Sequence, residues 1–313
     1  MNLITQILEK QNVFIIDGAL GTQLQKKGYD VNDSLWSAKF LNENPDAIAL
    51  VHKEYLEAGA NCIITASYQA SYEGFIKKGF TEGKAKELIQ SAITLAQKTR
   101  DDYWNTVEDK ENRIKPLVAA SIGPYGAYLA DGSEYSGNYG ITDEELKEFH
   151  KRRLDVIIET SPDILACETI PTLKEAQILS DLLKDKNIAS WITFSAKDGT
   201  HINSGDEITK CMSWLNDQNH ISAVGINCTA PQFISPLIEK TKQVCNKPIV
   251  IYPNGGSEYN PITKKWEDSN TNAEFGKMAH LWNKQGATLI GGCCQTGPEE
   301  IKDLVKYLLP TIK

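Results

Sequence analysis

The chain has 313 residues, 41% of them hydrophobic, and its 33 Lys and Arg against 41 Asp and Glu give a formal net charge of −8. The basic residues are scattered, which argues against a nucleic-acid or anionic-membrane surface. No apolar run approaches the roughly 18 residues of a membrane span, and the N-terminal segment lacks a signal-peptide pattern. We therefore expect a cytoplasmic protein that binds neither nucleic acid nor membranes.

Eight short apolar or β-branched runs, bounded by Gly, Pro, Asn or Asp, are typical of buried strands. They cover residues 13–17, 61–66, 117–121, 164–168, 189–195, 222–227, 248–252 and 287–291. Segments with helical periodicity lie between them, and four of these carry recognisable start signals. The signals are Asn44 before Pro45, the capping-box pairs Thr142 with Glu145 and Thr172 with Glu175, and Pro298.

The alternation of strands and helices predicts a parallel sheet covered by helices, because the strand runs are apolar on both faces. Eight such units, without a Gly-x-Gly-x-x-Gly turn after the first strand, favour a closed (β/α)8 TIM barrel over a doubly wound sheet. We expect a single domain over residues 1–313. In such barrels the chemistry lies where the strands end and the βα loops begin.

Three of the seven cysteines follow predicted strands: Cys228 follows the sixth, and Cys293 and Cys294 follow the eighth. The inward residues of alternate barrel strands can meet near the axis. Three thiolates with one open position are typical of a catalytic Zn²⁺ site. Two alternatives remain: small buried cysteines with no ligand, and a phosphate-binding loop formed with Gly255 and Gly256.

Two carboxylates also stand at strand ends. Glu168 follows the apolar run 164–167, which places it at the barrel mouth, where a substrate amine would compensate its charge. The alternative for Glu168 is a favourable charge near the start of the helix that follows Thr172. Asp17 precedes Gly18, and this dipeptide could equally be a plain turn.

The connection 122–137 is rich in Gly and Tyr and shows no helical period. Loops of this length in a compact domain are usually functional, so we expect a lid or a wall of the substrate site. Trp36 lies in the first βα connection, where it could cover the mouth or be an ordinary half-buried tryptophan.

Several segments together resemble one enzyme family, the homocysteine S-methyltransferases. The chain looks closest to the branch that takes methyl from S-methylmethionine or S-adenosylmethionine. GINC at 225–228 and GGCC at 291–294 are the specific signal. The other matching segments are IDGALGTQL at 16–24, DSLWSAK at 33–39, ITASYQAS at 64–71, GPYGAYLADGSEY at 123–135, LACETIP at 165–171 and VIYPNGG at 250–256.

The resemblance implies zinc held by Cys228, Cys293 and Cys294. It also implies that Glu168 and Asp17 bind the homocysteine amine, that Thr65 and Gln69 line the amino-acid site, and that Trp36 lies near the donor's sulfonium. Gln69 stands where betaine-dependent relatives carry a zinc-ligating tyrosine. Since Gln is a poor zinc ligand, another group would fill that position here. Tyr125 and Tyr128 could add cation–π faces.

We therefore expect zinc-dependent methyl transfer to L-homocysteine, a step of methionine biosynthesis, in a monomer or homodimer. The partners are small molecules, homocysteine and a cationic sulfonium donor. One alternative is a phosphate-binding barrel lyase or aldolase, although no predicted strand contains a lysine for a Schiff base and Lys197 lies just past the fifth. Another is a non-catalytic zinc-binding barrel, which would need a fourth protein ligand.

Overall fold

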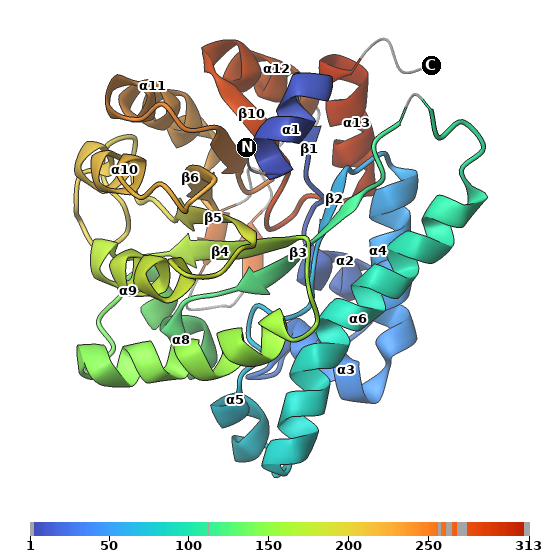
Figure 1. Ribbon diagram of the computed structural model, residues 1–313, viewed down its shortest axis with the longest axis vertical. Helices are drawn as coiled ribbons and strands as arrows, with labels where there is room; N and C mark the ends of the chain where they lie inside the picture. The colour runs from blue at the N-terminus through green and yellow to red at the C-terminus, as the bar shows by residue number, and fades with distance from the viewer. Residues whose placement is uncertain (1–2, 112, 256–257, 261–264, 268–273, 310–313) are drawn as a thin grey trace.

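The computed structural model describes residues 3–111, 113–255, 258–260, 265–267 and 274–309. Eight parallel strands form one sheet. An isolated parallel bridge between Ile16 and Cys62 joins its two edges, so the sheet is a nearly closed barrel surrounded by helices (Figure 1). The predicted (β/α)8 barrel is confirmed. In sheet order the strands are β1 (Phe14–Ile15), β10 (Ala287–Ile290), β7 (Ile249–Tyr252), β6 (Ala223–Asn227), β5 (Ala189–Phe194), β4 (Ile164–Ile170), β3 (Leu117–Ile122) and β2 (Cys62–Ile64).

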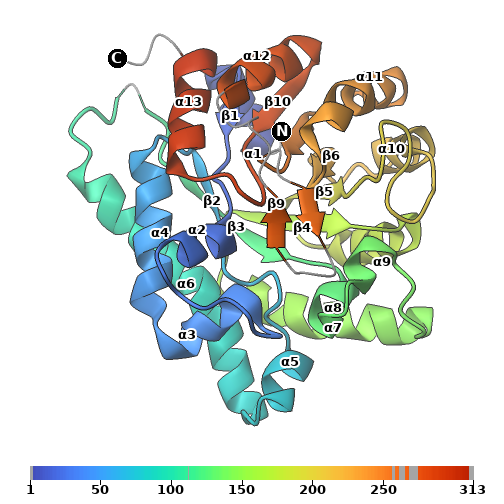
Figure 2. The same cartoon turned by 180° about the vertical axis from the view of Figure 1, so that it is seen from behind.

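All eight predicted strands exist, with ends that differ by a few residues. The first two are shorter than predicted, and β4 runs two residues further, through Glu168 to Ile170. An antiparallel pair, β8 (Glu258–Asn260) with β9 (Lys265–Glu267), was not predicted; it lies in front of the barrel strands in Figure 2. Gly256 of the predicted glycine loop lies outside the described residues.

Alternation along the strands fills the barrel interior. Side chains two residues apart point the same way, so positions 164 and 166 of β4, or 250 and 252 of β7, face inward together. Helix α1 (Leu3–Lys10) adds Ile4 and Ile7 to this interior cluster and lies in front of the strands in Figure 1. The cluster's buried members from the strands are Phe14, Ile16, Cys62, Ala119, Ile164, Ala166, Trp191, Ala223, Val250, Tyr252 and Leu289.

The helices bury their apolar faces against the outside of the barrel. The longer ones are α4 (Pro45–Glu57), α6 (Glu82–Thr106), α8 (Asp143–Ile158), α9 (Leu173–Leu183), α10 (Ile208–Asn216), α11 (Ile234–Val244), α12 (Phe275–Gln285) and α13 (Pro298–Leu308). The shorter ones are α2 (Leu20–Lys26), η1 (Trp36–Lys39), α3 (Phe40–Glu43), α5 (Tyr72–Lys77) and η3 (Pro231–Phe233). Among the described residues no helix is long and apolar enough to cross a membrane.

Three of the four predicted helix starts are confirmed as predicted. Asn44 caps α4, Thr142 and Glu145 form a capping box on α8, and Pro298 begins α13. At α9 only half of the predicted capping box forms: the Thr172 hydroxyl accepts from the Glu175 N–H at 3.0 Å. The Glu175 carboxylate does not return to Thr172, because it is engaged by α8 and by the connection after β3.

That connection contains helix, which corrects the prediction for residues 122–137. A short helix, α7 (Tyr125–Leu129), and a 3-10 turn, η2 (Ser133–Tyr135), lie in it. Left-handed backbone at Ala130 and Gly132 separates them. Five-residue helices are too short for a periodic signal, so the sequence pattern could not reveal them.

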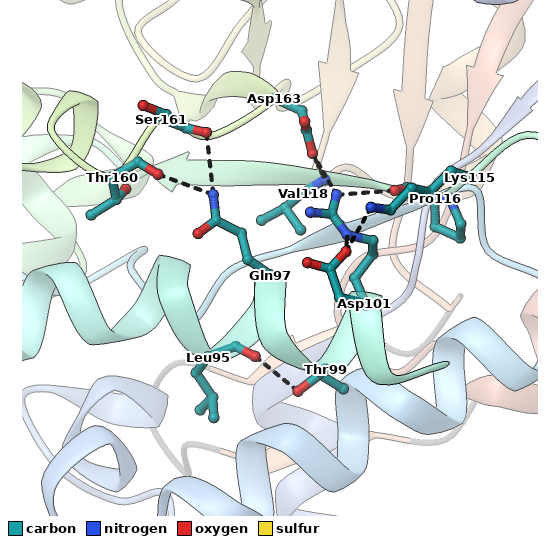
Figure 3. Close-up of polar contacts among 11 residues, drawn as sticks. Leu95, Gln97, Thr99, Asp101, Lys115, Pro116, Val118, Thr160, Ser161 and Asp163 are labelled. Carbon is teal, nitrogen blue, oxygen red and sulfur yellow. Dashed lines mark hydrogen bonds and ion pairs between the residues drawn. The ribbon is translucent and has the colours of Figure 1, made fainter. Parts of the chain in front are cut away.

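The opposite end of the barrel, where the strands begin, is held by ion pairs and hydrogen bonds around Arg100 of α6 (Figure 3). The Arg100 guanidinium donates to Asp163 at 2.9 Å, to Asp101 at 2.6 Å and to the Pro116 carbonyl at 3.2 Å. Asp163 also accepts from the Val118 N–H at 2.8 Å. This cluster ties α6 to the starts of β3 and β4.

Candidate metal and substrate site

The three predicted ligand thiols meet at the barrel mouth. The sulfur atoms of Cys228, Cys293 and Cys294 all lie within 4.8 Å of one another. Hydrogen bonds from the other two thiols hold the pKa of Cys228 well below its usual value, while the pKa values of Cys293 and Cys294 are raised. Three sulfurs sharing protons in this way form a ready ligand set for a soft or borderline metal ion. No fourth His, Cys, Asp or Glu of the described residues joins them.

Cys228 adopts a conformation that few non-glycine residues adopt, with φ 47°. Its N–H donates to the Tyr252 carbonyl at 3.1 Å. The residue before it, Asn227, bonds to Thr169, which is also left-handed with φ 61°. Strained backbone of this kind persists only where neighbouring contacts over-determine it, and it clusters at functional sites.

Glu168 points into the barrel, as the alternation from Ile164 and Ala166 requires. Its carboxylate accepts hydrogen bonds from the Ser121 and Tyr252 hydroxyls. Burial raises the pKa of Glu168 to about 7, against the lowering effect of these two donors. The alternative role as a charge at the start of the next helix does not fit, because the side chain is buried inside the barrel mouth.

Asp17 is the second buried carboxylate of the mouth. One oxygen accepts from the Ile64 N–H at 2.9 Å, and the other has no hydrogen-bond partner among the described residues. Burial is the main cause that raises the pKa of Asp17 well above its usual value, and repulsion from Glu168 adds to it. The plain-turn alternative leaves this orphaned oxygen unexplained, whereas a ligand ammonium would satisfy it.

Thr65 and Gln69 follow β2, and both side chains have protein partners. The Thr65 hydroxyl accepts from the Ser121 N–H at 3.1 Å and pairs with Ser67 at 2.7 Å. The Gln69 amide donates to the Ala127 carbonyl at 2.8 Å and, more weakly, to that of Ser34 at 3.3 Å. Thr65 therefore positions Ser121, whose hydroxyl donates to Glu168. Gln69 links α7 to the first βα connection.

Trp36 packs edge-to-face with Tyr68, with ring centroids 6.3 Å apart. A Cβ on Gly21 would lie 2.1 Å from the Trp36 ring, so α2 needs a glycine there. Tyr125 behaves differently: its ring packs on Phe149 of α8, 4.8 Å between centroids, and on Tyr128. No contact among the described residues joins Tyr125 to the three thiols.

The tyrosine that the structure does bring to the thiols is Tyr135, whose hydroxyl lies 4.0 Å from the Cys228 sulfur. Its neighbour Glu134 lies in the same 3-10 turn, and repulsion from Cys228 adds to the burial that raises the pKa of Glu134 to about 7. The sequence signal for these residues was the motif GPYGAYLADGSEY itself. Periodicity could not indicate which of its tyrosines faces the metal site.

A buried network holds this segment at both ends. Glu175 of α9 accepts from the Tyr125 N–H at 2.7 Å and from the Tyr139 hydroxyl at 2.7 Å. It also bonds to His150 at 2.8 Å, and His150 in turn meets Arg153, which donates to the Gly123 carbonyl. The buried His150, whose pKa is lowered chiefly by burial, thus lies between the Glu175 carboxylate and the Arg153 guanidinium and bonds to both.

The predicted alternative of a phosphate-binding loop is not supported by the glycines at the strand ends. Their N–H groups already donate within the protein: Gly255 to Cys294, Gly291 to Ile251 and Gly292 to Asp17. A phosphate site of this kind needs free backbone N–H groups. None of the eight described barrel strands contains a lysine, which also disfavours a Schiff-base aldolase.

Comparison with known proteins agrees with the arrangement at the mouth. The family described as homocysteine S-methyltransferase matches residues 14–308. Homocysteine S-methyltransferase YbgG of Bacillus subtilis is 49% identical over 308 residues, covering 98% of both chains. A selenocysteine methyltransferase of Astragalus bisulcatus is 44% identical, covering 98% of this chain and 96% of its own.

Among solved structures, the metallated form of the homocysteine methyltransferase MmuM from Escherichia coli superposes with a TM-score of 0.86. It is 38% identical, over 97% of this chain and 99% of that one. The identity and coverage show more than a common barrel, because they extend over the whole sheet and the cysteine-bearing strand ends. This chain belongs to the homocysteine S-methyltransferase family.

Proposed function

We propose that the protein transfers a methyl group from S-methylmethionine or S-adenosylmethionine to L-homocysteine in a zinc-dependent reaction that gives methionine. The observation that carries the proposal is the convergence of three thiols with two buried carboxylates, Asp17 and Glu168, at one barrel mouth. Family membership and the names of the relatives support homocysteine as the acceptor. A metal is supported by the metallated form of MmuM.

Zinc fits the donor set, because soft thiolate ligands favour it and three protein ligands leave a position for substrate. The absence of a fourth His, Cys, Asp or Glu among the described residues of the group also argues against a closed, non-catalytic site. When bound, a zinc ion would supply the Lewis acidity that keeps a substrate thiol deprotonated near neutral pH.

The chain's own side chains orient the acceptor. The orphaned oxygen of Asp17 and the carboxylate of Glu168 would bind the ammonium group of homocysteine, which directs its sulfur toward Cys228, Cys293 and Cys294. Binding of a cation would also remove the repulsion between the two carboxylates. The Ser121 hydroxyl donates to the Glu168 carboxylate, and the Thr65 hydroxyl in turn accepts from the Ser121 N–H, which fixes the position of Glu168.

In the transfer step, the bond from the sulfonium sulfur to its methyl carbon breaks as the homocysteine sulfur forms a new bond to that carbon. The thiol proton goes to solvent and the donor leaves as a neutral thioether, so no general acid is required. The rings of Trp36 and Tyr68 offer aromatic edges and faces that suit a cationic donor.

A reducing, cytoplasmic location belongs to the proposal, because oxidation of the vicinal Cys293 and Cys294 would destroy the ligand set. The free state of all seven cysteines in the structure is consistent with this.

The decisive experiment is Cys294→Ser, assayed for zinc content and for methyl transfer from S-methylmethionine to homocysteine. We expect both to be lost, while Cys245→Ser, a buried thiol outside the cluster, keeps both. Full zinc stoichiometry and full activity in Cys294→Ser would refute the three-thiolate site. Initial rates with S-methylmethionine, S-adenosylmethionine and betaine identify the donor, and betaine as the best one would refute the sulfonium assignment.

A further inference from the structure

One acidic residue lies in the 3-10 turn η2 that reaches the thiol cluster, directly before Tyr135, whose hydroxyl is 4.0 Å from the Cys228 sulfur. Glu134 lies in η2, half-buried, between Ser133 and Tyr135. Its charge interacts with Cys228, Cys294 and the hydroxyl of Tyr68. Burial, and then repulsion from Cys228, raises the pKa of Glu134 to about 7.

The backbone holds Glu134 firmly in this position. A Cβ on Gly126 would lie 2.3 Å from the Glu134 nitrogen, so η2 packs directly on α7. The turn before it is closed by the Asp131 side chain, which accepts from the Ser133 N–H at 2.9 Å. Glu175 anchors the segment at Tyr125 and Tyr139, on either side of η2.

No Lys or Arg of the described residues forms an ion pair with Glu134, and its carboxylate makes no hydrogen bond within them. The surroundings are anionic, since the thiols, Asp17 and Glu168 share the same mouth. A partly desolvated carboxylate among like charges is unfavourable unless a ligand brings positive charge to it. A purely structural role therefore does not explain a carboxylate at position 134.

We propose that Glu134 is the counter-charge for the sulfonium of the methyl donor, and that it makes the enzyme select a cationic donor over a neutral molecule of the same shape. This inference rests on the proposed function. The donor's methyl must reach a sulfur held at the thiols, so the sulfonium must lie within a few ångströms of the cluster that the turn carrying Glu134 adjoins. Tyr135 lies at this cluster, with its hydroxyl 4.0 Å from the Cys228 sulfur.

A pair of ligands that differ in charge but not in shape tests the proposal. S-methylmethionine is the cation, and 2-amino-5-methylhexanoic acid replaces its sulfonium sulfur by a CH group. In the zinc-loaded enzyme at saturating homocysteine, we expect Glu134→Gln to raise the KM for S-methylmethionine at least about tenfold. The inhibition constant of the neutral isostere against S-methylmethionine should change less than about twofold.

Four controls accompany this test. Zinc content and the KM for homocysteine should be unchanged in Glu134→Gln, and Glu134→Asp should recover part of the donor affinity. Glu148→Gln, an exposed acid on α8, controls for the change in net charge. Equal effects on the cation and the isostere, or no effect on either, would overturn the role of Glu134. Failure of the wild-type enzyme to use any sulfonium donor would instead overturn the proposed function.

Discussion

The amide side chain of Asn227 bonds twice to Thr169 and thereby joins the ends of β6 and β4. Its Oδ1 accepts from the Thr169 N–H at 2.7 Å, and its Nδ2 donates to the Thr169 hydroxyl at 2.8 Å. The same Oδ1 also accepts from the Thr193 hydroxyl at 2.7 Å. Since Asn227 precedes Cys228 and Thr169 follows Glu168, this bridge fixes a proposed metal ligand relative to a proposed substrate carboxylate.

Replacing Asn227 by Ala should loosen the metal site. The Thr169 N–H and hydroxyl and the Thr193 hydroxyl each lose a hydrogen bond, although the Thr193 hydroxyl keeps its pairing with Tyr252. A buried polar group left unsatisfied costs about 1–3 kcal/mol, and the strained backbone of Cys228 also loses its support. We expect metal affinity to fall about 10–100-fold, as when groups that orient ligands are removed. Metal content after dialysis and the unfolding free energy check this. Thr193→Val removes only one of the three bonds to Asn227, together with the Thr193–Tyr252 bond, and should have a smaller effect on metal affinity. Normal metal affinity in Asn227→Ala would contradict the account.

Glu175→Gln should impair donor binding without removing the metal. The substitution deletes the negative charge that compensates Arg153 and weakens the bonds to Tyr125 and Tyr139, so the segment carrying Glu134 loses its anchors. We expect a several-fold higher KM for the methyl donor, an unchanged KM for homocysteine and unchanged zinc content. Tyr139→Phe removes one of the bonds and should show a weaker form of the same pattern. An unchanged donor KM in Glu175→Gln would argue against this coupling.

His52 of α4 should make the protein less stable in acid. The side chain is fully buried, its ring nitrogens have no partner among the described residues, and burial lowers its pKa from 6.5 to about 4. Below pH 6.5 the unfolded chain takes up a proton that the folded chain does not, so this residue costs about 2 kcal/mol of stability between pH 7.5 and 5. The loss begins near pH 6.5 and continues down to about pH 4.

Urea unfolding of the wild type and of His52→Leu at several pH values measures this effect. The stability advantage of the variant should grow by about 2 kcal/mol from pH 7.5 to 5. A difference in unfolding free energy that does not change with pH would show that His52 does not titrate in this way.

Arg100→Met should lower the free energy of unfolding and leave the KM values for both substrates unchanged. The Arg100 side chain is 10% exposed, and its loss removes a donor from the Pro116 carbonyl and from Asp163, which keeps the Val118 N–H, at the end of the barrel where the strands begin (Figure 3). Because Asp163 is 31% exposed and keeps the Val118 N–H, we expect a cost of about 1–3 kcal/mol. The exposed pair of Lys98 and Asp102 offers the control, since Lys98→Met should cost little. A change in either KM would show that the effect reaches the mouth.

Part of the site could be predicted because strand alternation is a local pattern, and because successive strands of a (β/α)8 barrel lie side by side in the sheet. Alternation from Ile164 carries Glu168 to the inside, and the strand order brings Cys228 beside Cys293 and Cys294. The same alternation, counted from Ala119 and from Val250, also indicates that Ser121 and Tyr252 point into the barrel.

Periodicity and the positions of the strand ends therefore sufficed to predict the barrel, the three thiols at its mouth and the placement of Glu168. The directions of the loop side chains were settled by tertiary packing alone. The Tyr125 ring packs against Phe149 of α8, and the Tyr135 hydroxyl lies near the Cys228 sulfur. The Glu175 carboxylate bonds to His150 and Tyr139 instead of completing its capping box. The physical reason is that loop side chains take their direction from packing partners far away in the chain, which no local pattern encodes.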